Sequence, residues 1–223
     1  MTVIAIVDYG VNNLASVRNA IRAVGGEAQV TADAEVIDRA GGIVLPGVGA
    51  APVGMERLRA RGLEAVLRDV IARGTPALGI CLGMQLLSEW SEEGDVPCLG
   101  ILPGSTRLLR GAIKVPQIGW NQVRTRRDLR LWTGIPDNPY FYFVHSYICV
   151  PREQEAIAGE TEYGESFASA VVSNAVWGTQ FHPERSGKMG LCLIRNFVLT
   201  CEAAEKSANQ PKETRSSGIL GAL

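Results

Sequence analysis

The sequence lacks the features that would place it among nucleic-acid-binding or membrane proteins. Its formal net charge is only −1 over 223 residues, so no global positive field is available to hold nucleic acid. The short basic run at residues 124–127 is interpreted as solvated loop charge. No apolar run is long enough to cross a bilayer. We therefore expect neither nucleic acid nor a membrane as a partner.

Paired cysteines are also missing. The chain has five cysteines, an odd number, and no two of them have the C-x-x-C spacing of redox motifs and zinc sites. The amino-terminal apolar run has no basic residues before it and ends at Asp8, which favours a first core strand over a signal peptide. These patterns indicate a reducing, cytoplasmic location without a disulfide framework, and they predict neither a metal site nor a cofactor.

The first 90 residues alternate between strand-like and helix-like patterns. Apolar, β-branched runs predict strands, and apolar residues at helical spacing between them predict helices. The predicted strands are 2–7, 28–30, 42–45 and 75–80, with helices beginning near Leu14 and Leu63. This alternation predicts an α/β fold: a doubly wound, mostly parallel sheet with flanking helices.

The second half is less regular. Residues 140–144 predict an aromatic strand, and residues 168–173 and 176–180 predict an antiparallel pair near one edge of the sheet. The last helix is expected at residues 189–199. The composition turns polar from residue 202, so we expect one domain over residues 1–201 and a flexible tail over 202–223.

Cys81 lies in the pattern G-x-C-x-G (Gly79, Gly83), directly after an apolar strand and before a helix. This is the thiol form of a nucleophile elbow, in which small neighbours allow a sharp turn and the approach of a substrate. The helix end that follows would stabilise a thiolate, and the Leu82 amide would face the oxygen of a tetrahedral intermediate. The alternative is a buried cysteine at the end of a core strand.

A nucleophilic cysteine needs a proton shuttle, and the chain has only two histidines. His182 follows a short strand and precedes Pro183, which fixes a turn, and Glu184 could fold back to orient its ring. His145 ends the aromatic strand and is interpreted as a polar residue near a cleft rather than a second base. Alternatively, His182 is an ordinary loop histidine and Glu184 a surface acid.

The loop Pro46-Gly47-Val48-Gly49 follows a predicted strand and can turn backbone amides toward a neighbouring site. An ordinary strand-to-helix turn has the same composition. Because ligand sites of doubly wound sheets collect at the carboxyl ends of the strands, this loop and Cys81 should lie at the same edge.

With these residues the chain resembles the class I, triad-type glutamine amidotransferases. The general resemblance rests on residues 79–85 (GICLGMQ) together with His182-Pro183-Glu184. A narrower resemblance, to the glutaminase subunits of imidazole glycerol phosphate synthase, rests on residues 8–14 (DYGVNNL), 45–49 (LPGVG), 119–121 (GWN) and 143–147 (FVHSY). One departure is Gln117, where this family usually has a histidine.

The resemblance implies a set of roles. Cys81, His182 and Glu184 would be the catalytic triad that hydrolyses glutamine. The oxyanion would be held by Val48 and Leu82, and the substrate by Gly49 and Gln85. The ammonia would pass to a (β/α)8-barrel cyclase subunit of a 1:1 heterodimer, which makes imidazole glycerol phosphate and aminoimidazole carboxamide ribotide in histidine biosynthesis. Candidate interface residues are Trp120, Asn121, Tyr140 and Arg185.

The family's glutaminases are nearly silent until the cyclase carries its nucleotide ligand, and we hypothesise that the loop at residues 46–49 is the switch. Three alternatives stay open: a glutaminase of another synthase, a cysteine-dependent hydrolase of similar fold, and a non-catalytic scaffold.

Overall fold

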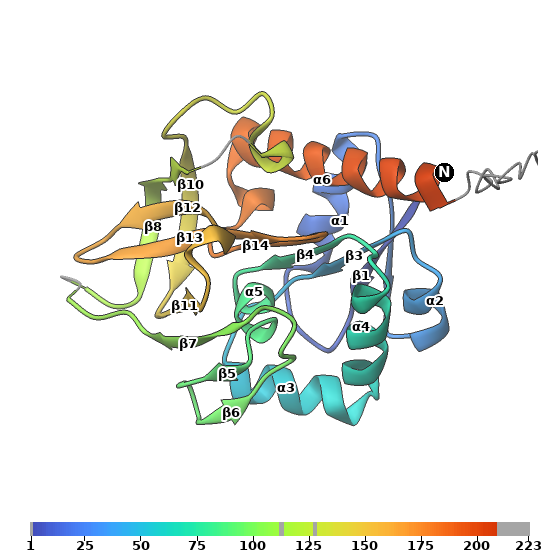
Figure 1. Cartoon of the computed structure of the whole chain (residues 1–223), viewed down its shortest axis with the longest axis horizontal. Helices are drawn as coiled ribbons and strands as arrows, with labels where there is room; N and C mark the ends of the chain where they lie inside the picture. The colour runs from blue at the N-terminus through green and yellow to red at the C-terminus, as the bar shows by residue number, and fades with distance from the viewer. Residues whose placement is uncertain (1, 112–113, 127–128, 209–223) are drawn as a thin grey trace, which may run out of the picture.

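The computed structural model describes residues 2–111, 114–126 and 129–208. Within these residues, twelve strands form one mixed sheet in the order β2-β1-β3-β4-β14-β13-β11-β7-β5-β6, to which β12 and β9 are added beside β13 (Figure 1). The strands of this sheet are β1 (Val3–Val7), β2 (Glu27–Thr31), β3 (Gly42–Leu45), β4 (Ala77–Ile80), β5 (Trp90–Ser91), β6 (Val96–Pro97), β7 (Gly104–Leu108), β9 (Arg124–Thr125), β11 (Tyr147–Pro151), β12 (Ile157–Glu162), β13 (Ser166–Ser173) and β14 (Val176–Thr179).

The predicted parallel half of the sheet is confirmed. β1 pairs in parallel with β2 and β3, and β4 pairs in parallel with β3 and β14. Strands β3, β4 and β14 are buried along their whole length, as expected for parallel strands covered on both faces.

Helices cover both faces of this half (Figure 1). One hydrophobic core contains α1 (Leu14–Ala23) and α6 (Gly187–Ala208) with Ile4 and Ile6 of β1. The other contains α3 (Ala51–Ala60), α4 (Leu63–Ala72) and Ile37 of α2 (Ala34–Asp38) with Ala5 and Val7 of the same strand. Alternate side chains of β1 therefore enter opposite cores, which is the arrangement of a doubly wound sheet.

The antiparallel pair of β13 and β14 forms as predicted, but its expected place near one edge was wrong. β14 lies in the middle of the sheet, where its other neighbour is the parallel strand β4. Each of the four residues of β14 is buried, so the strand has the apolar character of an interior strand rather than an edge.

The aromatic strand β10 (Tyr140–His145) pairs with β8 (Gln117–Gln122) in a separate two-stranded antiparallel sheet. Its buried side chains Phe141 and Phe143 pack on Phe181, which follows β14, with ring centroids 4.0 and 5.6 Å apart. Three short 3-10 helices complete the described residues, at Arg130–Trp132, Gln154–Ala156 and Pro183–Arg185.

Three helices differ from the prediction, and one of them, the five-residue α2, was not predicted at all. α6 runs to Ala208 rather than ending at residue 199, so the expected boundary at residues 201 and 202 lies inside a helix. Beyond the predicted end, Cys201 is buried against β3, where a Cβ atom added at Gly42 would lie 2.3 Å from its sulfur. The rest of the predicted tail, residues 209–223, lies outside the described residues.

α3 was not predicted, because Pro52 and Gly54 obscure its pattern.

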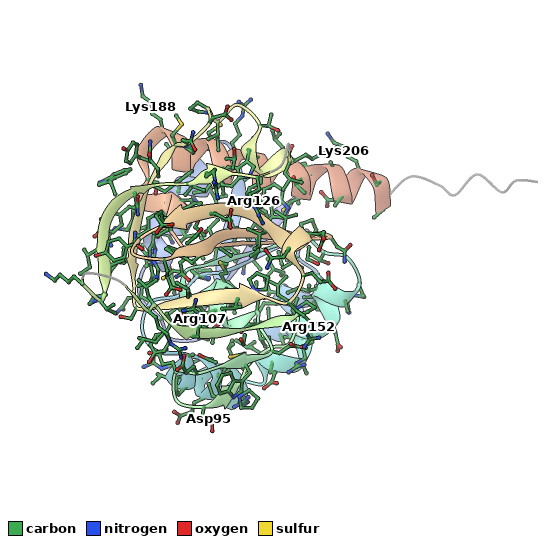
Figure 2. The ribbon with its side chains drawn as sticks, turned by 60° about the vertical axis from the view of Figure 1, so that its left-hand side comes forward. Asp95, Arg107, Arg126, Arg152, Lys188 and Lys206 are labelled. Atoms are coloured by element: carbon green, nitrogen blue, oxygen red, sulfur yellow. The ribbon has the colours of Figure 1, made fainter. Side chains whose placement is uncertain are left out.

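No helix of the described residues is both long and apolar enough to span a membrane. Basic side chains are distributed rather than gathered: Figure 2 shows Arg107, Arg126 and Arg152 at separate places over the strands. Each pairs with a carboxylate, and Arg126 shares Glu160 with Arg124. The run at residues 124–127 thus belongs, as far as it is described, to an ion-pair cluster on β9 and β12.

Replacing Gly83 by alanine should destabilise the fold strongly. Its added Cβ would lie 1.7 Å from the carbonyl oxygen of Leu45, so β3 and the helix after β4 would have to separate. We expect a loss of about 3 kcal/mol or more in the free energy of unfolding, measured by urea titration. Gly25→Ala is the control: Gly25 has a φ of 86° and open space around it, so about 1 kcal/mol is expected. Equal losses in the two variants would contradict the packing argument.

Candidate functional site

The chain turns sharply at Cys81, between β4 and the short helix α5 (Leu82–Leu86). Cys81 has a φ of 52° and a ψ of −109°, a strained conformation for a residue with a side chain. Both flanking glycines are required, because a Cβ at Gly79 would lie 2.8 Å from the backbone of Met84 and one at Gly83 would collide with β3. The sequence pattern G-x-C-x-G thus forms the strand-to-helix elbow that it predicted.

The structure brings His182 and Glu184 together beside this elbow. β14 runs parallel to β4 with Thr179 opposite Ile80, so the residues that follow both strands emerge at the same edge. His182 Nδ1 lies 2.7 Å from Glu184 Oε1, and both side chains are fully enclosed. Burial disfavours the charged ring, but the nearby Cys81 sulfur and the Glu184 carboxylate outweigh it and raise the pKa of His182. The arrangement therefore favours the charged imidazolium form of His182.

Asn13 is a member of this site to which sequence analysis assigned no role. It precedes α1 with a left-handed φ of 86°, a conformation that asparagine tolerates better than most residues. Its side-chain amide donates a hydrogen bond to Glu184 Oε1, the same oxygen that meets His182. Asn13 therefore holds the carboxylate that orients the histidine. Only its place in the quoted motif at residues 8–14 pointed to it.

A pocket of about 230 Å³ opens over Cys81. The sequence-predicted residues Val48, Gly49, Leu82 and Gln85 line it together with the cysteine. The remaining lining residues are Glu93, Pro116, Val144, His145, Ser146 and Tyr147. Glu93 is the only acidic side chain among the lining residues. Sequence analysis did not identify it, because it lies in a loop without a motif. Its Oε2 accepts a hydrogen bond from the Ala51 amide, 2.7 Å away.

The loop at residues 46–49 is held at its base and open at its tip. The Tyr9 hydroxyl donates a hydrogen bond of 2.6 Å to the Pro46 carbonyl oxygen, and burial raises the pKa of this tyrosine. A Cβ at Gly47 would lie 2.5 Å from that hydroxyl, so only glycine fits at this position. Gly49 has a φ of 110° and free space around it, and this end of the loop borders the pocket.

His145 is buried and borders the pocket, as expected for a polar residue near a cleft. Burial, with a smaller contribution from the nearby His182, lowers its pKa to about 4, and the hydrogen bond to Tyr147 opposes this shift. Its Nδ1 lies 2.9 Å from the Tyr147 carbonyl oxygen and its Nε2 3.0 Å from the Gln117 side chain. Held through these contacts, the ring is a structural element of the pocket wall.

The family model for class I glutamine amidotransferases ("Glutamine amidotransferase class-I") matches residues 5–201. The chain belongs to this family.

Proteins described as imidazole glycerol phosphate synthase subunit HisH are similar to this amidotransferase over most of its length. The protein of Moorella thermoacetica is 50% identical over 198 residues, covering 88% of this chain and 94% of its own. The protein of Dehalococcoides mccartyi is 47% identical, covering 87% of this chain and 95% of its own. That of Bacillus cereus is 45% identical, covering 92% of this chain and 98% of its own.

Solved structures support the fold of the amidotransferase. A putative GMP synthase subunit from Thermoplasma acidophilum superposes with a TM-score of 0.74 at 19% identity, covering 94% of this chain and 98% of that one. A glutamine amidotransferase of Thermotoga maritima gives 0.63 at 16% identity, covering 94% and 86%. At such identities the likeness concerns the fold alone.

An exposed aromatic surface lies on the outer face of β8 and β10. Trp120 and Tyr140 are each 55% exposed and Ile118 61%, although alternate residues of both strands are covered. The Trp120 ring meets Tyr142 edge to face, and the Arg185 guanidinium lies 4.6 Å above the same tyrosine ring. Three predicted interface residues therefore share one surface. The fourth, Asn121, points to the opposite face, where its amide donates to the Glu162 carbonyl oxygen.

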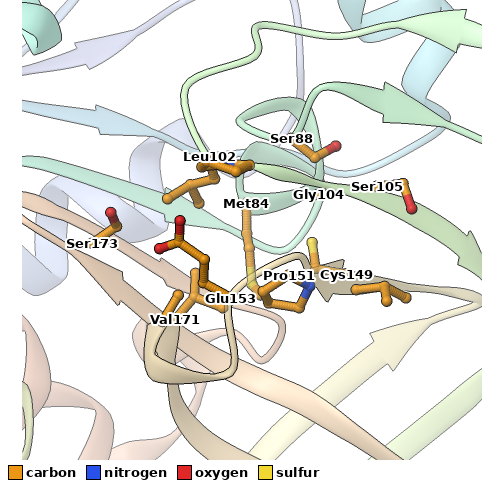
Figure 3. Close-up of a pocket in the computed structure, with 13 residues that line it drawn as sticks. Met84, Ser88, Leu102, Gly104, Ser105, Cys149, Pro151, Glu153, Val171 and Ser173 are labelled. Carbon is orange, nitrogen blue, oxygen red and sulfur yellow. The ribbon is translucent and has the colours of Figure 1, made fainter.

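A second, apolar pocket lies behind α5, where Met84 extends between Leu102, Cys149 and Val171 (Figure 3). It has room for about 20 Å³, roughly the volume that one water molecule requires. Among the described residues, no group of three or more His, Cys, Asp or Glu side chains is arranged so that it could hold a metal ion. By contrast, the cavity above Cys81 brings together a thiol, an imidazole and a carboxylate.

Asn13→Asp should impair the amidotransferase without unfolding it. Aspartate tolerates the left-handed backbone, but it replaces the amide donor with a second carboxylate beside Glu184. We expect kcat for glutamine hydrolysis to fall at least about tenfold, because the orientation of His182 depends on Glu184. Asn19→Asp, which makes the same change at an exposed position of α1, should be neutral. An unchanged kcat in the folded Asn13 variant would show that Asn13 does not position the carboxylate.

Proposed function

We propose that this protein is the glutaminase subunit of an imidazole glycerol phosphate synthase: it hydrolyses L-glutamine to L-glutamate and ammonia in histidine biosynthesis. The observation that carries the proposal is the buried His182–Glu184 pair, in contact at 2.7 Å, with its ring close enough to the Cys81 sulfur for that sulfur to raise the pKa of His182. Cys81 itself lines the pocket. The relatives described as subunits of that synthase, at 45–50% identity, supply the pathway.

In this mechanism the Cys81 thiolate attacks the side-chain amide carbon of glutamine, and the carbonyl electrons move onto the oxygen. The backbone amides of Val48 and Leu82 hold this oxyanion. The His182 imidazolium then donates its proton to the leaving nitrogen, the C–N bond breaks and ammonia departs. The neutral ring next removes a proton from water, which hydrolyses the thioester and restores the thiolate. Glu184 stabilises the charged ring in each half of the cycle.

The pocket also accounts for recognition of an α-amino acid. The ammonium group of glutamine requires an anion, and Glu93 is the only carboxylate among the lining residues. Gln85 and Gly49 complete the proposed substrate contacts at the same wall. Glutamine would therefore lie with its amide at Cys81 and its ammonium group toward Glu93.

The proposed partner is a (β/α)8-barrel cyclase subunit that consumes the ammonia, in a 1:1 heterodimer in the cytoplasm. The exposed surface of Trp120, Tyr140 and Ile118 fits a docking role, because aromatic residues are enriched in protein interfaces. β10 links this surface to the site: Tyr140 is at its exposed end, and the Val144 carbonyl oxygen lies 3.8 Å from the Cys81 sulfur. The loop at residues 46–49 is the proposed switch.

Two other functions would use the same site chemistry. A glutaminase serving a different synthase would share the triad but not the segments at residues 119–121 and 143–147. A cysteine-dependent hydrolase would share the elbow, but the pairing of G-x-C-x-G-x-Q with His-Pro-Glu favours glutamine. Neither has an observation of its own in its favour.

The test is glutamate release from glutamine by the purified protein, alone and with the barrel cyclase in the presence of its nucleotide ligand. We expect weak activity alone, strong stimulation by the loaded cyclase, and loss of both in Cys81→Ala. Cys192→Ala, at a half-buried position on α6, is the matched control and should behave like the unaltered protein. Rapid turnover that the cyclase leaves unchanged would refute the partner, and glutamate release by Cys81→Ala would refute the mechanism.

Glu93→Gln should separate binding from chemistry. The neutral side chain keeps an acceptor for the Ala51 amide but loses the charge that faces the substrate ammonium group. We expect KM for glutamine to rise about tenfold or more, with a smaller effect on kcat, because the contact is remote from the reacting carbon. Glu56→Gln on the exposed face of α3 provides the control. A fall in kcat at unchanged KM would exclude this role.

A further inference from the structure

Gln180 lies two residues before His182, just past the end of β14, and the catalytic steps above do not use it. We propose that its side-chain amide donates a hydrogen bond to the Cys81 sulfur, which fixes the position of the sulfur and favours its ionised form. This inference rests on the proposed role of Cys81 as the nucleophile.

The position of Gln180 is fixed by its surroundings. Its side chain is completely buried, and its main-chain amide donates a bond of 2.9 Å to the Ser169 carbonyl oxygen on β13. The pairing of β14 with β4 places it at the edge where Cys81 emerges, and its Nε2 lies 3.6 Å from the sulfur. That distance is within hydrogen-bond range for a sulfur acceptor.

The orientation of the amide follows from a chain of donors and acceptors. The Tyr147 carbonyl oxygen can only accept, so the Gln85 atom that lies 3.0 Å from it must be the Nε2 donor. That nitrogen lies 3.1 Å from the side-chain amide of Gln180, which must therefore present its oxygen there. The other end of the Gln180 amide, which faces the sulfur, is then the NH2 group. A rotated Gln180 would place two donors together and an acceptor against a thiolate.

The contacts of the sulfur show why this donor matters. The Val144 carbonyl oxygen, 3.8 Å away, can interact favourably only with a thiol proton, so it favours the neutral form. Gln180 has the opposite effect, because an N–H group favours a thiolate acceptor. The titratable groups around the sulfur are His182, Tyr9 and Cys149, and His145 and Glu93 line the same pocket. Burial keeps Tyr9 and Cys149 uncharged by raising their pKa values. Gln180 thus assists His182 without adding charge to the site.

The test is the pH dependence of Cys81 alkylation by iodoacetamide, without glutamine, followed by mass spectrometry of the Cys81 peptide. Gln180→Glu keeps an acceptor for Gln85 but places an oxygen against the sulfur. Gln180→Met removes the donor without adding charge. Because hydrogen bonds to charged groups contribute about 1.5–3 kcal/mol, we expect the alkylation midpoint to rise by about one pH unit or more in both variants. Gln29→Glu, at an exposed position of β2, should leave it unchanged.

Thermal unfolding of each variant shows that the folded protein is being titrated. An unchanged alkylation midpoint in either folded variant would overturn the proposal. If Gln180→Glu does not fold, a raised midpoint in Gln180→Met supports the proposal by itself. Failure of the underlying nucleophile assignment gives a different result: Cys81 of the unaltered protein would react no faster than Cys192, or Cys81→Ala would still release glutamate. The thiols of Cys98, Cys149 and Cys201 do not interfere, because burial raises their pKa values to about 11, 12 and 12.

Discussion

Between β4 and α5 the chain changes direction at a single residue, and Cys81 takes a conformation that costs a residue with a side chain about 1–3 kcal/mol. The surrounding packing has to supply this energy. Gly83 lies so close to the Leu45 carbonyl oxygen that β3 and α5 touch through their backbones, and the Cys81 amide donates a bond of 2.7 Å to the Thr179 carbonyl oxygen of β14. The elbow is therefore held between both parallel neighbours of β4. A strained nucleophile at this place needs the centre of a sheet, because an edge strand has a neighbour on only one side.

The same two neighbours bring the rest of the site. β3 continues into the loop at residues 46–49, and β14 continues through Gln180 to His182 and Glu184. The opposite wall of the pocket comes from β10 and β11, through Val144, His145 and Tyr147. Hydrogen bonds connect several buried polar groups at this junction: the Tyr147 carbonyl oxygen meets Gln85 and His145, and Glu184 meets His182 and Asn13. Because buried polar groups are costly to leave unpaired, these bonds fix side chains that are distant in sequence.

The features that could be predicted from the sequence are those encoded by local patterns. Alternating apolar runs predicted the parallel half of the sheet, and the glycines around Cys81 predicted the elbow because the turn needs them. Other features depend on distant contacts. The central place of β14 follows from its pairing with β4, and beyond the predicted end of α6 Cys201 is buried against β3. Glu93 and Gln180 have no distinctive spacing, so only the folded chain shows that they meet the site. Asn13 belongs to the motif at residues 8–14, but its bond to Glu184 also becomes visible only in the folded chain.

β10 connects two regions of the molecule in a span of five residues. Its start, at Tyr140, is exposed on the outer surface, while the carbonyl oxygen of Val144 contacts the reactive sulfur about 13 Å further along the strand. In the proposed complex, a substitution that adapts the outer face to a changed partner falls on the same strand that borders the Cys81 sulfur. Selection on association and selection on turnover therefore act on the same short segment. Lineages that exchange partners should consequently accumulate compensating changes at both ends of this strand rather than at the surface alone.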